Sequence, residues 1–174
     1  MSTYISMFFK LFDKDYGTNV LDYIGFLGPI LLLFISIFKL WNQPPYWRAY
    51  LVMFFINSAI NQVLKLWIRQ ERPTGGQTIM GEPYSGANVF GMPSAHTQSI
   101  FFSLTYLYLV KRSNTILIIE LFIALLTIYQ RFKYKQHTME QLCIGAVIGI
   151  GIAYLGWLST NEIIKKKFID FRKI

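Results

Sequence analysis

The stretch IGFLGPILLLFISIFKLW, residues 24–41, contains no charged side chain before Lys39. An apolar run of about 20 residues is long enough to cross the hydrocarbon core of a bilayer as a helix. Lipid offers no partner to a free backbone N–H or C=O group, so a run of this kind must satisfy those groups within itself. We therefore predict a first membrane-spanning helix here, with Pro29 as the position where it can kink.

Four further apolar runs follow the first, at residues 47–68, 94–110, 115–130 and 138–158. Charged residues make up only 15% of the 174 residues, whereas soluble domains carry about 25%. Most of these charges stand between the runs or at their ends, which is the pattern that a bilayer imposes. We predict an all-α fold, a polytopic membrane helical bundle of five to six spans, formed by a single domain over residues 1–174.

The two ends of the chain differ from this pattern. Within residues 1–20, four apolar side chains recur at helical spacing, which predicts an amphipathic helix in the membrane interface; a disordered tail is the alternative. Residues 159–174 are a basic tail suited to anionic lipid headgroups. In the last run, Gly145 and Gly149 form a GxxxG pair, which indicates close helix packing.

The chain carries 17 Lys and Arg residues against 9 Asp and Glu, a net charge of +8. A basic balance indicates an anionic partner, such as nucleic acid, anionic lipid or a phosphate-bearing substrate. In a membrane protein the last two are favoured. We expect membrane lipids and a lipid phosphate or diphosphate as partners, and no nucleic acid. The sequence holds no signal for an oligomeric state.

Two cations stand where the second run ends: Lys65 and, seven positions later, Arg72, which Pro73 follows. A lysine near the end of a span often extends its ammonium group to the interface, and this is the alternative for Lys65 taken alone. Residues 69–93 then form a long segment rich in Gly and Pro, which predicts a loop rather than a helix. A loop of this length in a small protein is usually functional or disordered.

The first histidine stands at the start of the third run, in the sequence Gly91-Met-Pro-Ser-Ala-His96. A proline and then Ser94 before an apolar run predict the start of a helix with Ser94 as its N-cap. The free N–H groups and the positive dipole end at a helix N-terminus favour a bound phosphate. We therefore expect His96, in the first turn, to lie beside an anion.

The second histidine stands where the fourth run passes into the fifth, between Arg131 and a polar pair, Glu140 and Gln141. His137 opens the last helix, so residues three and four positions later lie on its face. A nucleophilic histidine needs an acceptor on its other ring nitrogen, which fixes the tautomer. The amide oxygen of Gln141 can accept that N–H, and the carboxylate of Glu140 is the alternative.

The three clusters fall on one side of the membrane in this topology and contain both histidines of the chain. Together they indicate phosphoryl transfer. Lys65, Arg72 and Arg131 would neutralise the phosphate oxygens. His137 would attack phosphorus and His96 would protonate the leaving oxygen, before water activated by His96 hydrolyses the phosphohistidine. No cluster of cysteines or carboxylates has metal-ligand spacing, so we expect no metal and no cofactor.

The same clusters resemble the signature of the type 2 phosphatidic acid phosphatase superfamily, K-x6-R-P, P-S-G-H and S-R-x5-H-x3-D. The first motif is matched in full, and the second has alanine in place of glycine. The resemblance covers about residues 65–158. It implies a helical bundle in which His137 is the nucleophile, His96 the acid–base group and Gln141 the orienting residue. It implies phosphate binding by Lys65, Arg72, Ser94, Ala95 and Arg131.

The third motif departs from the family at two positions. Gln130 replaces the serine that helps to hold phosphate, and Gln141 replaces the aspartate that orients the nucleophile. The run His137-Thr-x-x-Gln141 and residues 91–102 are similar to the dolichyl-diphosphatase branch. That likeness implies a polyprenyl diphosphate substrate, hydrolysed to the monophosphate.

Other functions remain as alternatives. The substrate could be phosphatidate or undecaprenyl diphosphate, because the sequence does not specify the walls that bind the lipid. A non-catalytic protein that binds lipid phosphates would account for Gln130 and Gln141. A structural or interaction protein would require three ordered motifs to arise by chance.

The distribution of Lys and Arg predicts the orientation. Nine of them fall on the membrane side that holds the C-terminus and eight on the other side, and three of those eight are assigned to substrate. Without those three, five Lys and Arg residues remain on that side against nine on the side of the C-terminus, which favours a cytoplasmic C-terminus. We therefore expect an integral membrane protein whose active site lies on the opposite face, and the resemblance to the dolichyl-diphosphatase branch implies that this face is the lumen of the endoplasmic reticulum. In a prokaryote, the site would face the extracytoplasmic side of the plasma membrane.

Overall fold

The computed structural model describes residues 19–79 and 84–171. Over these residues the chain is helical apart from its connections, and it contains no strand. The interfacial helix expected within residues 1–20 falls on residues 1–18, which lie outside the described residues. That expectation therefore stays a prediction.

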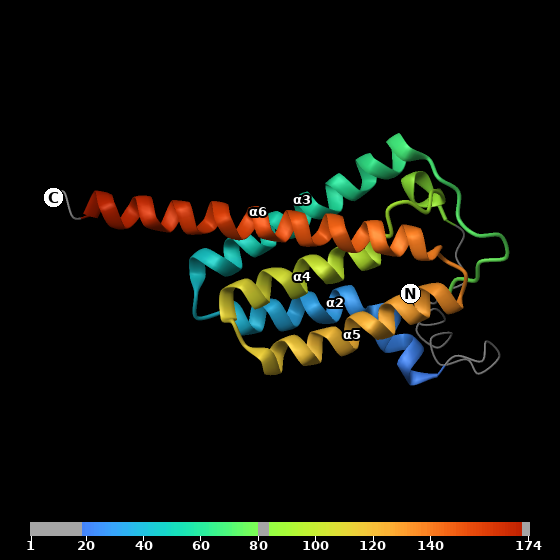
Figure 1. Cartoon of the computed structure of the whole chain (residues 1–174), viewed down its shortest axis with the longest axis horizontal. Helices are drawn as coiled ribbons and strands as arrows, with labels where there is room; N and C mark the ends of the chain where they lie inside the picture. The colour runs from blue at the N-terminus through green and yellow to red at the C-terminus, as the bar shows by residue number, and fades with distance from the viewer. Residues whose placement is uncertain (1–18, 80–83, 172–174) are drawn as a thin grey trace, which may run out of the picture.

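Each of the five predicted runs forms an α-helix, so the all-α prediction is confirmed (Figure 1). The α-helices of the described residues are α2 (Val20–Leu40), α3 (Pro44–Ile68), α4 (Ala95–Lys111), α5 (Asn114–Lys133) and α6 (Met139–Phe171). The long loop between α3 and α4 holds one short 3₁₀ helix, η2 (Gly86–Val89).

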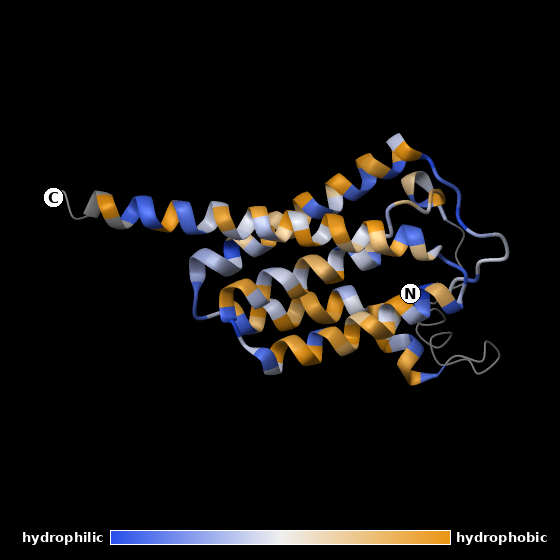
Figure 2. Ribbon diagram, viewed as in Figure 1, coloured by the Kyte–Doolittle hydropathy of each residue, from blue (hydrophilic) through white to orange (hydrophobic). Residues whose placement is uncertain are grey.

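Four of these helices, α2, α3, α5 and α6, are long and apolar enough to cross a membrane. Their outer faces are apolar (Figure 2), and they expose large side chains such as Phe38, Phe55 and Trp67, as lipid-facing surfaces do. The remaining predicted span, residues 94–110, forms α4, which has 17 residues and is about 26 Å long. The protein is a polytopic membrane helical bundle.

Helix α4 is the centre of the bundle. Its buried apolar residues contribute to both hydrophobic clusters. Ile100 and Leu104 pack with Leu32 of α2 and with α5. Phe102 and Tyr106 pack with Tyr50 of α3 and with α6. A helix enclosed in this way places its N-terminus, where Ser94 is the N-cap as predicted, among the ends of all its neighbours.

Helix α6 is longer than predicted. The last run was expected to end at residue 158, but the helix continues to Phe171. Residues 159–171 therefore extend the last helix instead of forming a separate tail, and Figure 1 shows this end projecting beyond the other helices. A helix of 33 residues is about 50 Å long, so its basic end reaches past the hydrocarbon core.

Successive helices run in opposite directions, so alternate ends meet at the same side of the bundle. One side gathers the start of α2, the end of α3, the start of α4, the end of α5 and the start of α6. The three sequence clusters stand at four of these five positions, the end of α3, the start of α4, the end of α5 and the start of α6. The structure thus brings them to one end of the bundle, as the topology predicted.

The GxxxG pair lies where α6 crosses the start of α4. A Cβ atom at Gly145 would lie 2.7 Å from the carbonyl oxygen of Ser94, and one at Gly149 would lie 2.2 Å from that of Gln98. The two backbones approach too closely for any side chain between them. The predicted packing role of this pair is confirmed.

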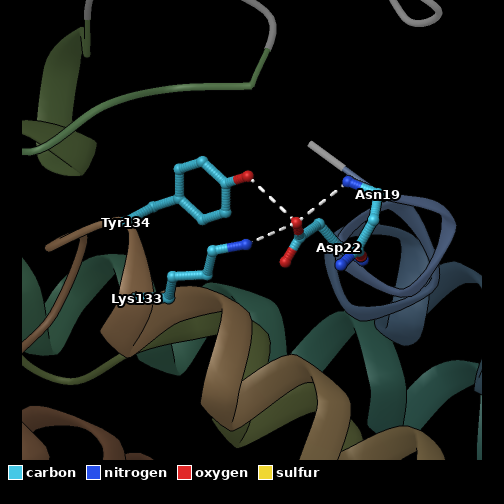
Figure 3. A network of polar contacts seen from close by, with 4 residues as sticks. All are labelled: Asn19, Asp22, Lys133 and Tyr134. Carbon is cyan, nitrogen blue, oxygen red and sulfur yellow. Dashed lines mark hydrogen bonds and ion pairs between the residues drawn. The ribbon is translucent and has the colours of Figure 1, made fainter. Parts of the chain in front are cut away.

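A polar network joins α2 to the end of α5 (Figure 3). The Asp22 carboxylate accepts from Lys133 Nζ at 2.7 Å, from the Tyr134 hydroxyl at 3.1 Å and from the Asn19 backbone N–H at 3.1 Å. Asn19 in turn caps α2 by accepting from the Asp22 N–H. At the next turn of α2, the Thr127 hydroxyl of α5 donates to the Gly25 carbonyl at 2.6 Å. We call this contact between the two helices the α2–α5 seam.

Replacing Gly149 should weaken the α4–α6 contact. Gly149→Ala introduces a methyl group against backbone, and overpacking of this kind costs about 1–3 kcal/mol. Gly151→Ala is the matched control because nothing lies within 4 Å of its Cβ position. Thermal unfolding in detergent should show a lower Tm for Gly149→Ala alone. Equal Tm values for the two variants would contradict the described contact.

Removing the Asp22 carboxylate should loosen the α2–α5 seam. Asp22→Ala leaves Lys133 and Tyr134 without their acceptor, and a loss of this kind costs about 1–3 kcal/mol. Glu162→Ala provides the control, since its pair with Lys165 is 61% and 70% exposed and exposed pairs contribute about 1 kcal/mol or less. Denaturant unfolding in micelles should separate the two variants. A Glu162→Ala effect as large as that of Asp22→Ala would argue against a stabilising seam.

Candidate active site

The second histidine is held between the loop after α3 and the start of α6. Arg72 Nη1 lies 3.1 Å from His137 Nε2 and donates to the Gln136 carbonyl at 2.7 Å. Arg72 Nε donates to the Asn88 carbonyl at 3.0 Å, and the Tyr84 ring stacks against the guanidinium group at 3.8 Å. Arg72 is thus fixed beside the ring nitrogen that faces the cavity described below.

The other ring nitrogen of His137 points to Gln141. The distance from His137 Nδ1 to Gln141 Oε1 is 3.2 Å. The Gln141 amide nitrogen donates to Gln70 Oε1 and to the Glu71 carbonyl, both at 2.8 Å, which turns its oxygen toward the histidine. Of the two alternatives for the acceptor, the structure places Gln141 on the ring. Glu140 is exposed, and its carboxylate accepts from Gln70 at 3.4 Å instead.

The first histidine is paired with the arginine of α5. Arg131 Nη2 lies 2.6 Å from His96 Nε2, and Nη1 donates to Gln136 Oε1 at 2.9 Å. The Phe26 ring of α2 covers both groups, 5.1 Å from the guanidinium carbon and 5.9 Å from the imidazole centroid. Arg131 Nε is buried and has no hydrogen-bond partner among the described residues.

The remaining predicted phosphate ligands occupy different positions. Lys65 is fully buried, and its Nζ donates to the Phe90 carbonyl at 2.5 Å, so it holds the loop before α4. Ser94 is buried as the N-cap of α4, where its hydroxyl pairs with Thr97. Of the two residues before His96, Ala95 lines the cavity and Ser94 does not.

A cavity of about 360 Å³ lies between these groups. Its basic lining comes from Arg72, Arg131, His96 and His137, and among the described residues it includes no Asp or Glu. The other lining residues are Phe26, Gln62, Thr78, Ile79, Tyr84, Asn88, Ala95 and Gln136. A cavity with two guanidinium groups and no carboxylate suits an anion.

A second, mostly apolar hollow of about 340 Å³ adjoins the first between α2 and α4. It shares Phe26, Ala95 and His96 with the cavity. Its other lining residues are Pro29, Ile30 and Ser99, and Ile30 is 52% exposed on the outer face of α2. Phe26, Ala95 and His96 thus lie between the anion cavity and a hollow that reaches the lipid-facing surface.

Burial and the surrounding charges determine the protonation states. Burial, and after it the positive charges of Arg72, Lys65 and Arg131, lower the pKa of His137 to about 2. The ring is therefore neutral at pH 7. Because Nδ1 faces the Gln141 oxygen, Nδ1 carries the proton and donates, and Nε2 keeps its lone pair. Burial raises the pKa of the Tyr84 phenol, so it stays protonated and can donate to Gln136.

The sequence prediction missed some residues that shape this site. Gln136 connects both arginines, Tyr84 stacks on Arg72, and Phe26 closes the cavity from α2. None of these residues belongs to a motif, and Phe26 looks like any lipid-facing residue of an apolar run. Gln130, at the position of the motif serine, is buried against Gly25 with no partner for its amide among the described residues, and it does not line the cavity.

The order and spacing of these residues match a known family. The sequence profile of the PAP2 superfamily matches residues 46–165. The chain belongs to the PAP2 superfamily. The resemblance found in the three motifs is thereby confirmed. PAP2 phosphatases are hydrolases that act on lipid phosphates.

Relatives and a solved structure agree with this assignment. The chain is 26% identical over 174 residues to dolichyldiphosphatase 1 of Homo sapiens, covering 88% of this chain and 69% of that protein. It is 31% identical over 120 residues to the chloroplastic lipid phosphate phosphatase epsilon 1 of Arabidopsis thaliana, covering 64% of this chain. The fold matches a transmembrane PAP2-type phosphatidylglycerolphosphate phosphatase from Bacillus subtilis with a TM-score of 0.63 at 20% identity, covering 88% of this chain and 79% of that one.

The match to some relatives is partial. The chain spans 40% of the Arabidopsis protein. It spans 49% of dolichyldiphosphatase 1 of Dictyostelium discoideum, to which it is 32% identical over 120 residues covering 63% of this chain. The shared region in each case is about the length of the PAP2 match.

Substitutions at Gln141 and Glu140 separate the two candidate partners of His137, the predicted nucleophile. Gln141→Leu removes the acceptor from His137 Nδ1. The loss of a hydrogen bond worth about 1.4 kcal/mol or more lowers kcat about 10-fold or more. Glu140→Gln should leave kcat within about twofold of wild type, because an exposed hydrogen bond contributes little. Phosphate release by both variants is the measurement. Equal activity of Gln141→Leu and wild type would show that Gln141 does not orient the ring.

Proposed function

We propose that this PAP2 protein hydrolyses a polyprenyl diphosphate of the dolichyl type to the monophosphate through a phosphohistidine on His137. One observation carries the proposal. The unprotonated Nε2 of His137 faces a cavity bordered by two arginines and a second histidine, while Gln141 holds its Nδ1. This is the arrangement that a histidine nucleophile needs.

Binding of the terminal phosphate is supported by the donors that border the cavity. Arg72 donates to the lone pair of His137 in the free site, and a phosphate oxygen can replace the ring as its acceptor. The unpaired Nε of Arg131 is available to a second oxygen. Lys65 holds the loop from behind through the Phe90 carbonyl and does not need to touch the anion. The guanidinium groups supply the charge that a metal would otherwise bring, so we expect metal-independent activity.

The reaction takes two steps. In the first, His137 Nε2 attacks the terminal phosphorus, the bond from phosphorus to the bridging oxygen breaks, and the lipid monophosphate leaves with a proton from His96. In the second, His96 accepts a proton from water as the water oxygen attacks phosphorus. The P–N bond then breaks, and orthophosphate leaves a neutral His137. Arg131 Nη2 donates to His96 Nε2 at 2.6 Å. When a phosphate oxygen takes Arg131 as its donor, this nitrogen is released to carry the proton that the first step uses, and the second step returns it.

The hydrocarbon chain of the substrate has a place beside the cavity. The hollow between α2 and α4 leads from His96 to the exposed Ile30, which would let an isoprenoid chain remain in lipid while its phosphates enter the cavity. The dolichyldiphosphatase relatives support the polyprenyl substrate. Phosphatidate and undecaprenyl diphosphate are the alternatives, and the relative from Arabidopsis is a lipid phosphate phosphatase.

The non-catalytic alternative is less well supported. It rests on the two glutamines that depart from the motif. The retained contact from Gln141 to His137 keeps the ring oriented, and Gln130 lies away from the cavity, so neither change removes a part of the reaction. The excess of Lys and Arg at the C-terminal side supports a site on the lumenal face of the endoplasmic reticulum, or on the extracytoplasmic face of a plasma membrane.

The test is phosphate release by detergent-purified protein without added metal and with a chelator present. Dolichyl diphosphate, undecaprenyl diphosphate and phosphatidate are offered in parallel, with His137→Ala as the control. We expect release from the polyprenyl diphosphates, and a loss of about 1000-fold or more in the control, because nucleophile and base contributions are of this size.

Three other results would each change the proposal. Preferential release from phosphatidate would replace the proposed substrate with the alternative. No release from any lipid by a folded protein would favour the non-catalytic binding protein. Release that survives in His137→Ala would contradict the phosphohistidine.

A further inference from the structure

Gln136 is the residue directly before the proposed nucleophile, and its side chain is 2% exposed. Its backbone N–H donates to the Arg131 carbonyl at 2.9 Å, and its carbonyl accepts from Arg72 Nη1 at 2.7 Å. The preceding residue, Lys135, has a left-handed backbone with φ of 48°, which turns the chain into this position. The backbone of Gln136 therefore joins the two segments that carry the arginines.

The side chain of Gln136 makes a second set of contacts inside the cavity wall. Its Oε1 accepts from Arg131 Nη1 at 2.9 Å and from the Tyr84 hydroxyl. Its Nε2 donates to the Gln77 carbonyl. The oxygen faces two donors and the nitrogen faces an acceptor, so these partners fix which way the amide points.

The neutrality of this amide matters for the charge of the cavity. Arg131 is almost fully buried, and its positive charge has no carboxylate partner among the described residues. Gln136 holds one arm of the guanidinium group and His96 holds the other, and both partners are neutral acceptors. A glutamate of the same shape would pair with Arg131 and cancel the charge that attracts an anion. It would also place an oxygen against the Gln77 carbonyl.

We propose that Gln136 is a positioning residue for the phosphate site. It holds the guanidinium groups of Arg72 and Arg131 at the cavity and, being neutral, leaves their charge to the bound anion. The inference rests on the proposed function only in taking that anion to be a phosphate group. Gln136 belongs to none of the three motifs, so the family resemblance assigns it no role.

The test measures binding of inorganic phosphate to the full-length protein in detergent, as the rise in Tm across a phosphate titration. It uses Gln136→Glu, Gln136→Leu and a control, Gln43→Glu. Gln43 precedes α3 at the opposite end of the bundle, so the control changes the net charge equally without changing the site.

We expect Gln136→Glu to weaken phosphate binding at least about 10-fold, because the new carboxylate competes for Arg131 by about 1.4 kcal/mol or more. Its Tm without phosphate should be kept or raised, since an ion pair forms. Gln136→Leu should weaken binding less, because the charge of Arg131 remains. Gln43→Glu should bind as wild type does. In an Arg131→Gln background, Gln136→Leu should have no further effect on binding.

Three results would overturn the proposal. Phosphate binding by Gln136→Glu within twofold of wild type would show that the neutral amide is not required. If both Gln136 variants bind phosphate more weakly and both also show an equally lowered Tm without phosphate, Gln136 has a structural role alone. If phosphate does not raise the Tm of the wild-type protein, the phosphate site itself is contradicted. Because binding is measured without turnover, a catalytically silent protein with the expected binding pattern would contradict the proposed function and leave the role of Gln136 intact.

Discussion

Hydrocarbon cannot hydrogen-bond, and this constraint decides where the polar groups of the protein lie. Each helix satisfies its own backbone, so side chains able to do chemistry are confined to helix ends and to the enclosed interior. A network of buried amide side chains extends from the site along α3 into the interior of the bundle. Asn61 donates to Gln98 Oε1 at 2.8 Å and to the Pro93 carbonyl at 3.2 Å, and Gln98 donates to Asn57. These amides fasten α3 to the start of α4, where the loop carrying the second motif enters the bundle.

Within the site, positive groups are held by neutral partners. Lys65 donates to a backbone carbonyl, Arg72 donates to two backbone carbonyls and to the imidazole of His137, and Arg131 donates to an amide and to the imidazole of His96. In contrast, Lys133 lies outside the cavity and is paired with the carboxylate of Asp22. Neutral acceptors fix the direction of a cation without cancelling its charge, which keeps the electrostatic attraction for an anion in a poorly solvated space.

The sequence was sufficient to predict the helices and the convergence of the motifs. Apolar runs have a length set by the bilayer, and alternation of direction then places Lys65, His96 and His137 at one end. Other features depended on distances that spacing does not encode. Gln141 and Glu140 are both within reach of His137 on an ideal helix. The structure distinguishes them by the 3.2 Å contact of Gln141 with the ring, which the hydrogen bonds of its amide to Gln70 and Glu71 support. Phe26 and Gln136 had no periodic or motif signal. The helical continuation beyond residue 158 was missed because the basic residues there do not look like a span.

The glycine at position 91 gives the replacement of aspartate by Gln141 a wider meaning. A Cβ atom at Gly91 would lie 2.4 Å from Gln141 Oε1, so the longer amide occupies the space that a side chain would fill. Gly91 also donates its N–H to the carbonyl of Gln70, which in turn holds the Gln141 amide. An aspartate at position 141 would be too short to reach these partners, and any larger residue at position 91 would displace the glutamine. The glutamine at position 141 therefore requires a glycine at position 91, so a mutation that adds a side chain at 91 would alter the orientation of His137 without touching that residue.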